Sequence, residues 1–406
     1  MLLANQEKEK RGKVSPLALR ERGQGVRAKV ALVHDHFAQE GGAEKVFQAL
    51  AEIFPAAPIF TLLYDNRHIK NFAGRKLYPS ILQKFPFGVS KYQWYMPFMP
   101  AAIESLDLQN YDVVISSASS FAKGVITRPD AIHLCYCHTP TRYLWHYSHQ
   151  YLEELKLLNF LKPIISWQIS RIRQWDRAAA ERVDYFIANS QTTWERIRKY
   201  YGRESAVIYP PVLTAAFSIS QNVDNYFLAG GRFIPHKRLD LAILAFNKLN
   251  IPLKIFGEGP DWPRLKKLAR SNIEFLGKIN EEKKARLMSE CRAFIHPQEE
   301  DFGISAVEAQ ASGRPVIAFG KGGARETIID GITGIFFNEQ TWEELADAVL
   351  RFLYQRHDFN PQIIKESAER FNAERFKREI REFIMKALKI SNYSNFSRRS
   401  GIPPWR

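Results

Sequence analysis

The chain has 406 residues, of which 58 are Lys or Arg and 43 are Asp or Glu, giving a formal net charge of +15. Its composition, 45% hydrophobic and 25% charged, is that of a globular protein and excludes collagen, a coiled coil and a disordered chain. Three cysteines are too few for a disulfide framework, and no apolar run has the length of a membrane span or a signal peptide, so we expect a soluble cytoplasmic protein.

Two terminal segments hold nearly half of the excess positive charge. Residues 1–28 have a net charge of +4 and residues 391–406 one of +3, and both segments have the composition of basic, poorly ordered tails. The sequence contains no helix-turn-helix, zinc-finger or RNP pattern, so we expect no nucleic acid partner. Peripheral contact with the anionic inner face of the cell membrane is favoured instead, because each basic residue near such a surface adds about 1 kcal/mol.

From Lys29 onward, short apolar runs alternate with amphipathic stretches. Continuous apolar runs are typical of parallel strands that are buried on both faces, and the alternation with helices indicates βαβ units. The expected strands are Val30–His34, Ile59–Leu63, Val113–Ser116, Ile132–Cys137, Tyr185–Ala188 and Val207–Tyr209, then Tyr226–Ala229, Leu253–Phe256, Ile273–Leu276, Ala293–His296, Val316–Phe319 and Gly334–Phe337.

The alternation breaks between residues 210 and 224, which are polar and turn-rich and are interpreted as a linker. We therefore predict an α/β fold of two Rossmann-like domains, residues 29–215 and 225–372, that face each other across a cleft. An apolar stripe along residues 373–390 predicts a final helix that packs against the rest of the protein.

Gly41 and Gly42 follow the first strand and precede an amphipathic helix. Their unhindered amides and the helix dipole form a candidate phosphate site, although a Gly-Gly pair is often only a turn. His34 and His36 flank Asp35 in the same loop, and without further ligands they are better interpreted as loop and cap residues than as a metal site.

His138 ends the strand that contains Cys135 and Cys137. The two thiols lie on one side of the strand and His138 on the other, so the three cannot share a tetrahedral metal ion without distortion. At the end of a parallel strand, a neutral imidazole is well placed to hold a substrate hydroxyl, while a purely structural role remains the alternative.

Arg232 and Lys237 follow Gly230-Gly231 at the start of the second half. A planar guanidinium and a point charge at this spacing can neutralise a diphosphate without a metal ion, and a solvated basic turn is the alternative. The chain has neither a P-loop nor a complete Gly-x-Gly-x-x-Gly fingerprint, which disfavours ATP hydrolysis and dinucleotide redox chemistry.

The most specific pattern is Glu300 to Glu308, in which Gly303 opens a helix. Both carboxylates can face the cleft and accept hydrogen bonds from vicinal hydroxyl groups, such as those of a sugar ring and a ribose. The free amides of Gly303 and Ile304 lie between them and suit a phosphate. One of the two glutamates could instead serve only to cap the helix.

These motifs resemble those of the family-4 retaining glycosyltransferases with the GT-B fold. The resemblance extends from about residue 29 to residue 385. Similarity to bacterial mannosyltransferases of surface-polysaccharide assembly comes from His-Asp-His, Gly-Gly-Ala-Glu and Cys-His-Thr-Pro-Thr-Arg-Tyr-Leu-Trp. The residues that carry the family resemblance are Glu300 and Glu308 (Glu-x7-Glu), Gly231-Arg232 with Lys237, Gly41-Gly42, and His138-Thr-Pro.

The resemblance implies transfer of a sugar from a nucleotide diphosphate donor with retention at the anomeric carbon. It assigns Arg232 and Lys237 to the donor diphosphate, where they would stabilise the leaving group without a metal or another cofactor. Gly41 and Gly42 would close on the phosphates from the first domain, which would be the acceptor side. The second domain would bind the nucleotide sugar, and the helix at 373–390 would cross back to the first domain.

For the sugar itself, the resemblance assigns Glu308 to the ribose hydroxyls and Glu300, with the amides after it, to the donor hexose. His138 would lie beside the donor sugar and the reaction centre. GDP-mannose is the first donor we expect, and a UDP-hexose is the alternative. A non-catalytic protein that binds sugar nucleotides or polymers is a second alternative.

The acceptor is expected to be a glycan or a lipid-linked glycan. Residues 84–102 contain a dense aromatic cluster, Phe85, Phe87, Tyr92, Trp94, Tyr95 and Phe98 with Met96, that could meet lipid headgroups or a lipid-linked acceptor. Packing within the domain is an equally good interpretation of these residues.

Overall fold

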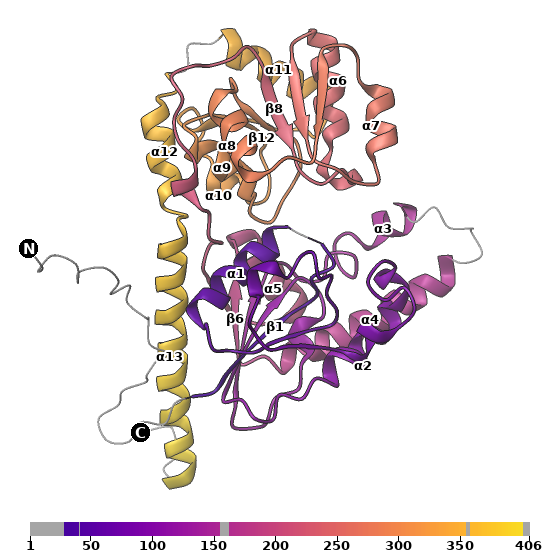
Figure 1. Cartoon of the computed structure of the whole chain (residues 1–406), viewed down its shortest axis with the longest axis vertical. Helices are drawn as coiled ribbons and strands as arrows, with labels where there is room; N and C mark the ends of the chain where they lie inside the picture. Colours follow the sequence, from indigo (N-terminus) through magenta and orange to yellow (C-terminus); the bar gives the residue numbers. More distant parts are fainter. Residues whose placement is uncertain (1–27, 40, 155–161, 355–357, 401–406) are drawn as a thin grey trace, which may run out of the picture.

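The computed structural model describes residues 28–39, 41–154, 162–354 and 358–400. Its two α/β domains lie one above the other in Figure 1, and a long final helix runs along one side of the lower domain. Most of the predicted N-terminal tail and the last six residues lie outside the described residues.

The N-terminal domain is built on a seven-stranded parallel sheet of order β3-β2-β1-β4-β5-β6-β7. Its central strands are continuous apolar runs, and every residue of β4 and β5 is buried, as expected for strands covered on both faces. The strands are β1 (Val30–His34), β2 (Ile59–Thr61), β3 (Leu77–Pro79), β4 (Val113–Ala118), β5 (Ile132–Cys137), β6 (Tyr185–Ala188) and β7 (Ser205–Val207).

Helices cover both faces of this sheet. On one face, α2, α4 and α5 bury residues such as Ile103, Ile172 and Ile197 with Cys135 and Cys137 of β5; on the other, α1 buries Phe47 and Leu50. The helices are α1 (Gly42–Ile53), α2 (Met99–Glu104), α3 (Ser148–Glu154), α4 (Lys162–Glu181) and α5 (Gln191–Tyr201), with short 3-10 turns η1 (Lys70–Phe72), η2 (Ile81–Lys84), η3 (Tyr92–Phe98) and η4 (Ala122–Gly124).

The C-terminal domain repeats this plan with a six-stranded parallel sheet of order β10-β9-β8-β11-β12-β13. The sheet order reverses between β8 and β11, which is where parallel α/β sheets bind ligands at their carboxyl edge. The strands are β8 (Phe227–Gly230), β9 (Leu253–Phe256), β10 (Ile273–Gly277), β11 (Phe294–His296), β12 (Val316–Phe319) and β13 (Gly334–Phe337).

Two cores again lie on the two faces of the sheet. One is formed with α6, α7 and α11, and the other with α8, α9, α10 and α12. The helices are α6 (Leu239–Leu249), α7 (Trp262–Leu268), α8 (Glu281–Glu290), α9 (Ile304–Ala311), α10 (Ala324–Thr327), α11 (Trp342–Tyr354) and α12 (Pro361–Glu369), with 3-10 turns η6 (Thr214–Ala216) and η7 (Pro235–Lys237).

The last helix, α13 (Ala373–Ser400), leaves the C-terminal domain and packs beside the N-terminal sheet, as Figure 1 shows. Phe376, Ile380 and Ile384 enter the same core as α1, so the apolar stripe does pack against the first domain. The helix is longer than predicted: residues 391–400 belong to it, and their interpretation as part of a poorly ordered tail is wrong. Their polar, turn-forming composition is compatible with continuing a helix that is already nucleated.

The other predicted strands agree with the structure to within a residue or two, with two differences. The last strand of the first domain is Ser205–Val207 rather than Val207–Tyr209, and the edge strand β3 was not predicted. β3 has only three residues and ends in a proline, a pattern too short to distinguish from a loop. Among the described helices, none is long and apolar enough to cross a membrane.

Candidate active site

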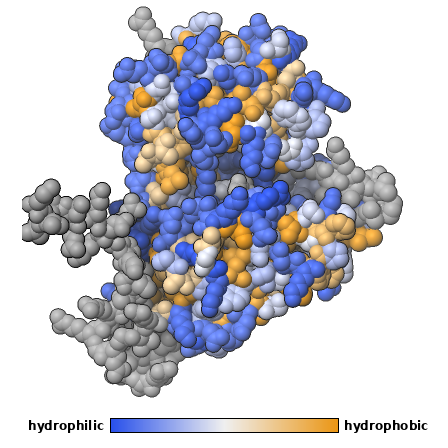
Figure 2. Space-filling view, viewed as in Figure 1, coloured by the Kyte–Doolittle hydropathy of each residue, from blue (hydrophilic) through white to orange (hydrophobic). Residues whose placement is uncertain are grey.

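The candidate residues lie where the carboxyl ends of the two sheets face each other. Hydrophilic side chains gather along the boundary between the domains on the face shown in Figure 2. On the N-terminal side, the relevant loops follow β1, β4 and β5; on the C-terminal side, they follow β8, β11 and β12.

Glu300 lies in the loop between β11 and α9. This loop is held tightly, because the backbone N–H of Gly323 donates to the Glu300 carbonyl at 2.8 Å and a Cβ on Gly323 would lie 2.3 Å from the Cα of Phe302. The Glu300 carboxylate forms an ion pair with Lys237 and accepts a hydrogen bond from Nε2 of Gln298 at 3.1 Å. Glu300 and Lys237, which were both predicted to bind the sugar donor, come from different loops and are in direct contact.

Gly303 is the N-cap of α9, with φ at +92°. This left-handed backbone favours glycine, and a Cβ here would also approach Nε2 of His296 to 3.3 Å. The turn directs the first amides of the eight-residue helix toward the domain boundary. The sequence predicted this helix start at Gly303.

Glu308 is buried and lies about one helical turn after the start of α9. Its Oε1 accepts hydrogen bonds from Nζ of Lys45 at 2.9 Å and from Nζ of Lys284 at 3.0 Å. Lys45 comes from α1 of the opposite domain, so this ion pair crosses the boundary. Although burial opposes the charge of Lys45, the carboxylates of Glu308 and Glu281 raise its pKa above the ordinary value.

Arg232 and Lys237 are brought to the same edge by the loop between β8 and α6. Arg232 is exposed, and its Nη1 donates to Oε1 of Gln39 in the opposite domain at 2.5 Å. Burial, together with the positive charges of Arg142 and Arg232, lowers the pKa of Lys237 to about 7, an effect that the contact with Glu300 opposes. A phosphate would be a second anionic partner for Lys237, beside Glu300.

Gly42 lies at the start of α1, next to its N-cap Gly41. A Cβ on Gly42 would lie 2.9 Å from Cδ1 of Ile304, the first residue of α9. The amino ends of the two predicted phosphate-binding helices thus meet across the boundary. Because Gly41 has an extended backbone, its glycine is not required by conformation, whereas Gly42 permits the close approach.

His138 is buried at the end of β5. Its Nε2 lies 2.8 Å from Oγ of Ser117 on β4, and its backbone carbonyl accepts a hydrogen bond from Oγ1 of Thr193 at 3.2 Å. Burial lowers the pKa of His138 to about 4, so the imidazole is neutral near neutral pH. Among these groups, none comes from the C-terminal domain, so the structure does not bond His138 directly to Glu300, Lys237 or Arg232.

Two family models match the chain in succession. The one described as Glycosyltransferase Family 4 matches residues 40–215, and the one described as Glycosyl transferases group 1 matches residues 215–378. The chain is a family-4 glycosyltransferase with the GT-B fold. It is therefore an enzyme, and the resemblance drawn from its motifs is confirmed.

Relatives and solved structures agree with this assignment. The glycosyltransferase is 28% identical over 295 residues to alpha-1,3/1,6-mannosyltransferase ALG2 of Dictyostelium discoideum, covering 59% of this chain and 66% of that protein. It is 26% identical over 187 residues to O-antigen chain mannosyltransferase C of Escherichia coli, covering 42% of this chain and 48% of that protein. The matches thus span between about half and two thirds of the length of these relatives.

The fold is also that of Anabaena Alr3699/HepE, crystallised with UDP and glucose. The two share 18% identity at a TM-score of 0.66, over 88% of this chain and 99% of that chain. At this identity, the likeness concerns the fold alone.

Sequence reasoning missed a cluster of ion pairs that joins the two domains of the glycosyltransferase. Asp301, next to Glu300, accepts from Nη2 of Arg142 at 2.7 Å and pairs with Arg196, and both arginines come from the N-terminal domain. Despite burial, these guanidinium groups lower the pKa of Asp301 to about 2. The acidic run Glu299–Asp301 was visible in the sequence, but its partners lie more than a hundred residues away.

A second cross-domain contact joins Glu326 to α5. The Glu326 carboxylate accepts hydrogen bonds from the backbone N–H groups of Gln191 at 2.7 Å and Thr192 at 3.1 Å. These are first-turn amides of α5, which lack partners within the helix, so the carboxylate caps it from the other domain.

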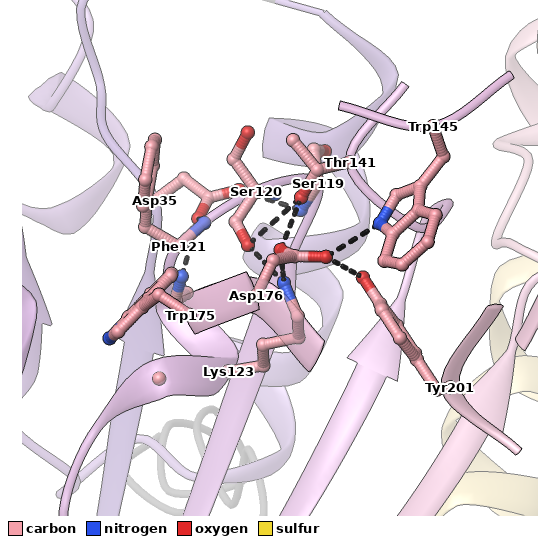
Figure 3. Close-up of polar contacts among 12 residues, drawn as sticks. Asp35, Ser119, Ser120, Phe121, Lys123, Thr141, Trp145, Trp175, Asp176 and Tyr201 are labelled. Atoms are coloured by element: carbon pink, nitrogen blue, oxygen red, sulfur yellow. Dashed lines mark hydrogen bonds and ion pairs between the residues drawn. The ribbon is translucent and has the colours of Figure 1, made fainter. Parts of the chain in front are cut away.

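Asp35 was also missed as a structural residue (Figure 3). Its Oδ2 accepts from the amides of Ser119 and Ser120 at 2.6 and 2.9 Å, and its Oδ1 from those of Phe121 and Ala122 at 2.8 and 2.6 Å. The carboxylate therefore fixes the loop after β4 to the loop after β1. Among the described residues, no group of three or more His, Cys, Asp or Glu side chains is arranged to hold a metal ion.

A buried ion pair between Lys123 and Asp176 stabilises the neighbouring loop (Figure 3). Asp176, on α4, also accepts from Oγ1 of Thr141, Nε1 of Trp145 and the hydroxyl of Tyr201, each at 2.8 Å. With all its acceptor capacity used, Asp176 anchors the segment that carries His138 and Arg142.

Proposed function

We propose that this glycosyltransferase moves a hexosyl group, with retention of anomeric configuration, from a nucleotide diphosphate sugar to a glycan or lipid-linked glycan. GDP-mannose is the first donor proposed, and no bound metal takes part in the proposed reaction. The observation that carries the proposal is the convergence of Lys237, Glu300 and the Gly42–Ile304 contact at one boundary between the domains.

The proposal uses Arg232 and Lys237 to bind the donor diphosphate and to stabilise its charge as the glycosidic bond breaks. Arg232 is exposed and donates to the neutral side-chain amide of Gln39, and Lys237 has a depressed pKa that a phosphate would raise again. Two preplaced cations aimed at developing negative charge are an effective source of transition-state stabilisation.

Donor binding would exchange ion pairs at the two glutamates. Glu300 would release Lys237 to the diphosphate and accept hydroxyl groups of the hexose. Lys45 and Lys284 both donate to Oε1 of Glu308, and in the proposal the second oxygen, Oε2, accepts from the ribose hydroxyls. The amides of Gly42, Gly303 and Ile304 would contact the phosphates, with Gly41 beside them.

His138 would contribute as a neutral group. A neutral imidazole can accept a hydrogen bond from a sugar hydroxyl or hold a backbone carbonyl near the reaction centre, and its depressed pKa keeps it neutral through the physiological range. We place it beside the donor hexose, where closure of the domains would exclude water and so limit hydrolysis of the donor.

The identity of the donor base and sugar is the finer part of the proposal. The relatives named as mannosyltransferases support mannose, and the complex of Alr3699/HepE with UDP and glucose supports a UDP-hexose as the alternative. The discrimination between these donors depends on a few hydrogen bonds.

The test is to incubate the purified enzyme with GDP-mannose or UDP-glucose and a panel of oligosaccharide and lipid-linked acceptors, and to determine the anomeric configuration of the product by NMR. We expect turnover with GDP-mannose and a product of the same configuration as the donor. Turnover with UDP-glucose alone would support the alternative donor, and an inverted product would contradict the proposed mechanism. A chelator should leave turnover unchanged, and a loss of turnover would overturn the proposal that no bound metal takes part.

A further inference from the structure

Residues 85–98, here called the aromatic loop, connect η2 to α2 and contain η3. The structure divides its large side chains into two sets. One set packs against the core beneath, and it consists of Phe85, Tyr92, Tyr95 and Met96. The other set points outward: Phe87, Trp94 and Phe98 are 70%, 67% and 58% exposed. Packing within the domain thus accounts for four of the seven side chains of the cluster.

The outward position of Phe87 is built into the backbone. Phe87 has φ at +54°, a left-handed conformation that costs a bulky residue about 1 kcal/mol or more. The next residue, Gly88, permits the turn, because a Cβ there would lie 2.5 Å from the carbonyl oxygen of Leu82. The Tyr95 hydroxyl donates to the Pro86 carbonyl at 2.6 Å and holds the turn closed.

The aromatic loop also lies in a strongly basic part of the chain. Residues 66–103 contain six Lys or Arg and no Asp or Glu. Two of these cations, Lys84 and Lys91, are exposed within or next to the loop, and Nζ of Lys91 lies 5.5 Å from the centre of the Trp94 ring. The exposed part of the aromatic loop and its flank thus contain both aromatic rings and lysines, and residues 66–103 contain no carboxylate to neutralise the lysines.

This surface is next to the candidate active site. The ring of Tyr92 at the start of η3 lies 4.6 Å from that of His36, which follows β1. The same loop after β1 carries Gln39, which accepts a hydrogen bond from Arg232. The aromatic loop is therefore close to the boundary between the two domains.

We propose that the outward face of the aromatic loop docks on an anionic lipid bilayer. Phe87, Trp94 and Phe98 would enter the headgroup region, where aromatic rings are stable, and Lys84 and Lys91 would contact lipid phosphates. The charge of the segment favours this occupant over an apolar protein partner, because lysines add affinity only toward an anionic surface. The inference goes beyond the transfer reaction and is testable without any nucleotide sugar.

The test is flotation of the full-length enzyme with vesicles of equal parts phosphatidylcholine and phosphatidylglycerol. We expect binding that is lost on vesicles of phosphatidylcholine alone and weakened at about 1 M salt, where the Debye length is about 3 Å. The variant Phe87→Asn/Trp94→Ser/Phe98→Ser should reduce the partition coefficient about tenfold or more, since it removes the rings that enter the membrane. Asn at position 87 tolerates the left-handed backbone, so folding is preserved.

Two further variants make the result specific. Lys84→Gln/Lys91→Gln should also reduce the partition coefficient, by about thirtyfold, because each of the two lysines near the surface contributes about 1 kcal/mol. Tyr354→Ser removes a ring that is 82% exposed on the C-terminal domain and should leave binding unchanged. Thermal unfolding checks that all variants fold.

If the wild-type enzyme does not bind the vesicles, the proposal is overturned. It is also overturned if the triple variant binds as well as the wild type, because basic residues elsewhere in the chain would then do the binding. A concentration-dependent dimer that the triple variant abolishes, without vesicle binding, would assign the surface to a second copy of the chain and would also overturn it. Transfer activity on a soluble acceptor, measured in parallel, separates failure of this inference from failure of the proposed function.

Discussion

The two sides of the domain boundary supply their residues in different ways. On the C-terminal side, Glu300, Gly303 and Glu308 come from one loop and the helix that follows it. On the N-terminal side, Gln39, Lys45, Arg142 and Arg196 come from separate elements, and each one contacts a residue of the other domain.

This difference matters for how the site is encoded. Spacing along one helix places the C-terminal groups, so they are arranged by local structure that forms wherever the helix forms. The N-terminal groups reach their partners only when both domains are folded and α13 has packed on the N-terminal domain. Variants of the residues proposed to bind the donor should therefore reduce chemistry, and variants of residues that pair across the boundary should reduce the coupling between domains.

The largest effect is expected from Lys237→Ala on the C-terminal side. Removing a cation from the leaving diphosphate should reduce kcat by about a hundredfold, as for the loss of one group that stabilises transition-state charge. Steady-state transfer kinetics measure this. Lys283→Ala, which removes an exposed lysine of α8, is the matched control and should leave kcat unchanged. A Lys237→Ala enzyme with wild-type kcat would remove Lys237 from the mechanism.

Asp301→Asn should produce the next largest effect, and on stability rather than on chemistry. It leaves Arg142 and Arg196 partly buried without their carboxylate and should lower the unfolding free energy by about 2 kcal/mol. Because the pKa of Asp301 is depressed to about 2, its contribution should be present near neutral pH and lost as the pH falls from about 4 to about 2.

Thermal unfolding measured with Asp301→Asn beside Asp330→Asn, an exposed acid, makes this comparison. Equal midpoints for the two variants would mean that the cross-domain cluster does not stabilise the protein.

Gly42→Val should reduce the rate of sugar transfer about tenfold, because the added side chain collides with Ile304. A Cβ at this position already lies within 2.9 Å of Cδ1 of Ile304, and the branched side chain makes the overlap larger. The double variant Gly42→Val/Ile304→Ala should recover much of the activity, because it removes the atoms that collide. If the second substitution gives no recovery, the two helix starts do not need to approach each other during turnover.

The smallest effect is expected in the pH dependence of donor affinity. With a pKa near 7, Lys237 loses its proton as the pH rises, so the donor dissociation constant should rise a few-fold between about pH 6 and about pH 8. His138 stays neutral over this range and does not contribute. Lys237→Arg keeps a permanent charge and should bind the donor with a flat pH profile. An equally steep profile in Lys237→Arg would assign the titration to another group.

The sequence alone was sufficient for the features that depend on local pattern. The strands of both sheets are continuous apolar runs, and Gly303 marks the start of α9 because a helix that begins in a left-handed turn favours glycine. The apolar stripe through Phe376, Ile380 and Ile384 correctly predicted that the last helix packs on the protein.

The features that sequence reasoning missed depend on distance in space. Asp301 and Arg142 are 159 residues apart, and nothing in the local sequence of either one identifies the other. Asp35 was noted only as the residue between two loop histidines, yet four backbone amides of another loop donate to its oxygens. The aromatic loop was ambiguous because its inward and outward rings alternate irregularly, and nothing in the local sequence indicates the left-handed turn at Phe87.

The most direct test of the account is thermal unfolding of the enzyme with each of several nucleotide sugars, with Glu308→Ala and Glu281→Ala measured alongside. A donor at a hundred times its dissociation constant adds about 2.7 kcal/mol of stability. Glu281 is the matched control, since it pairs with the same lysines as Glu308 but is exposed. We predict stabilisation by GDP-mannose that Glu308→Ala abolishes and Glu281→Ala retains. Stabilisation that persists in Glu308→Ala, or that no nucleotide sugar produces, would contradict the account of this site.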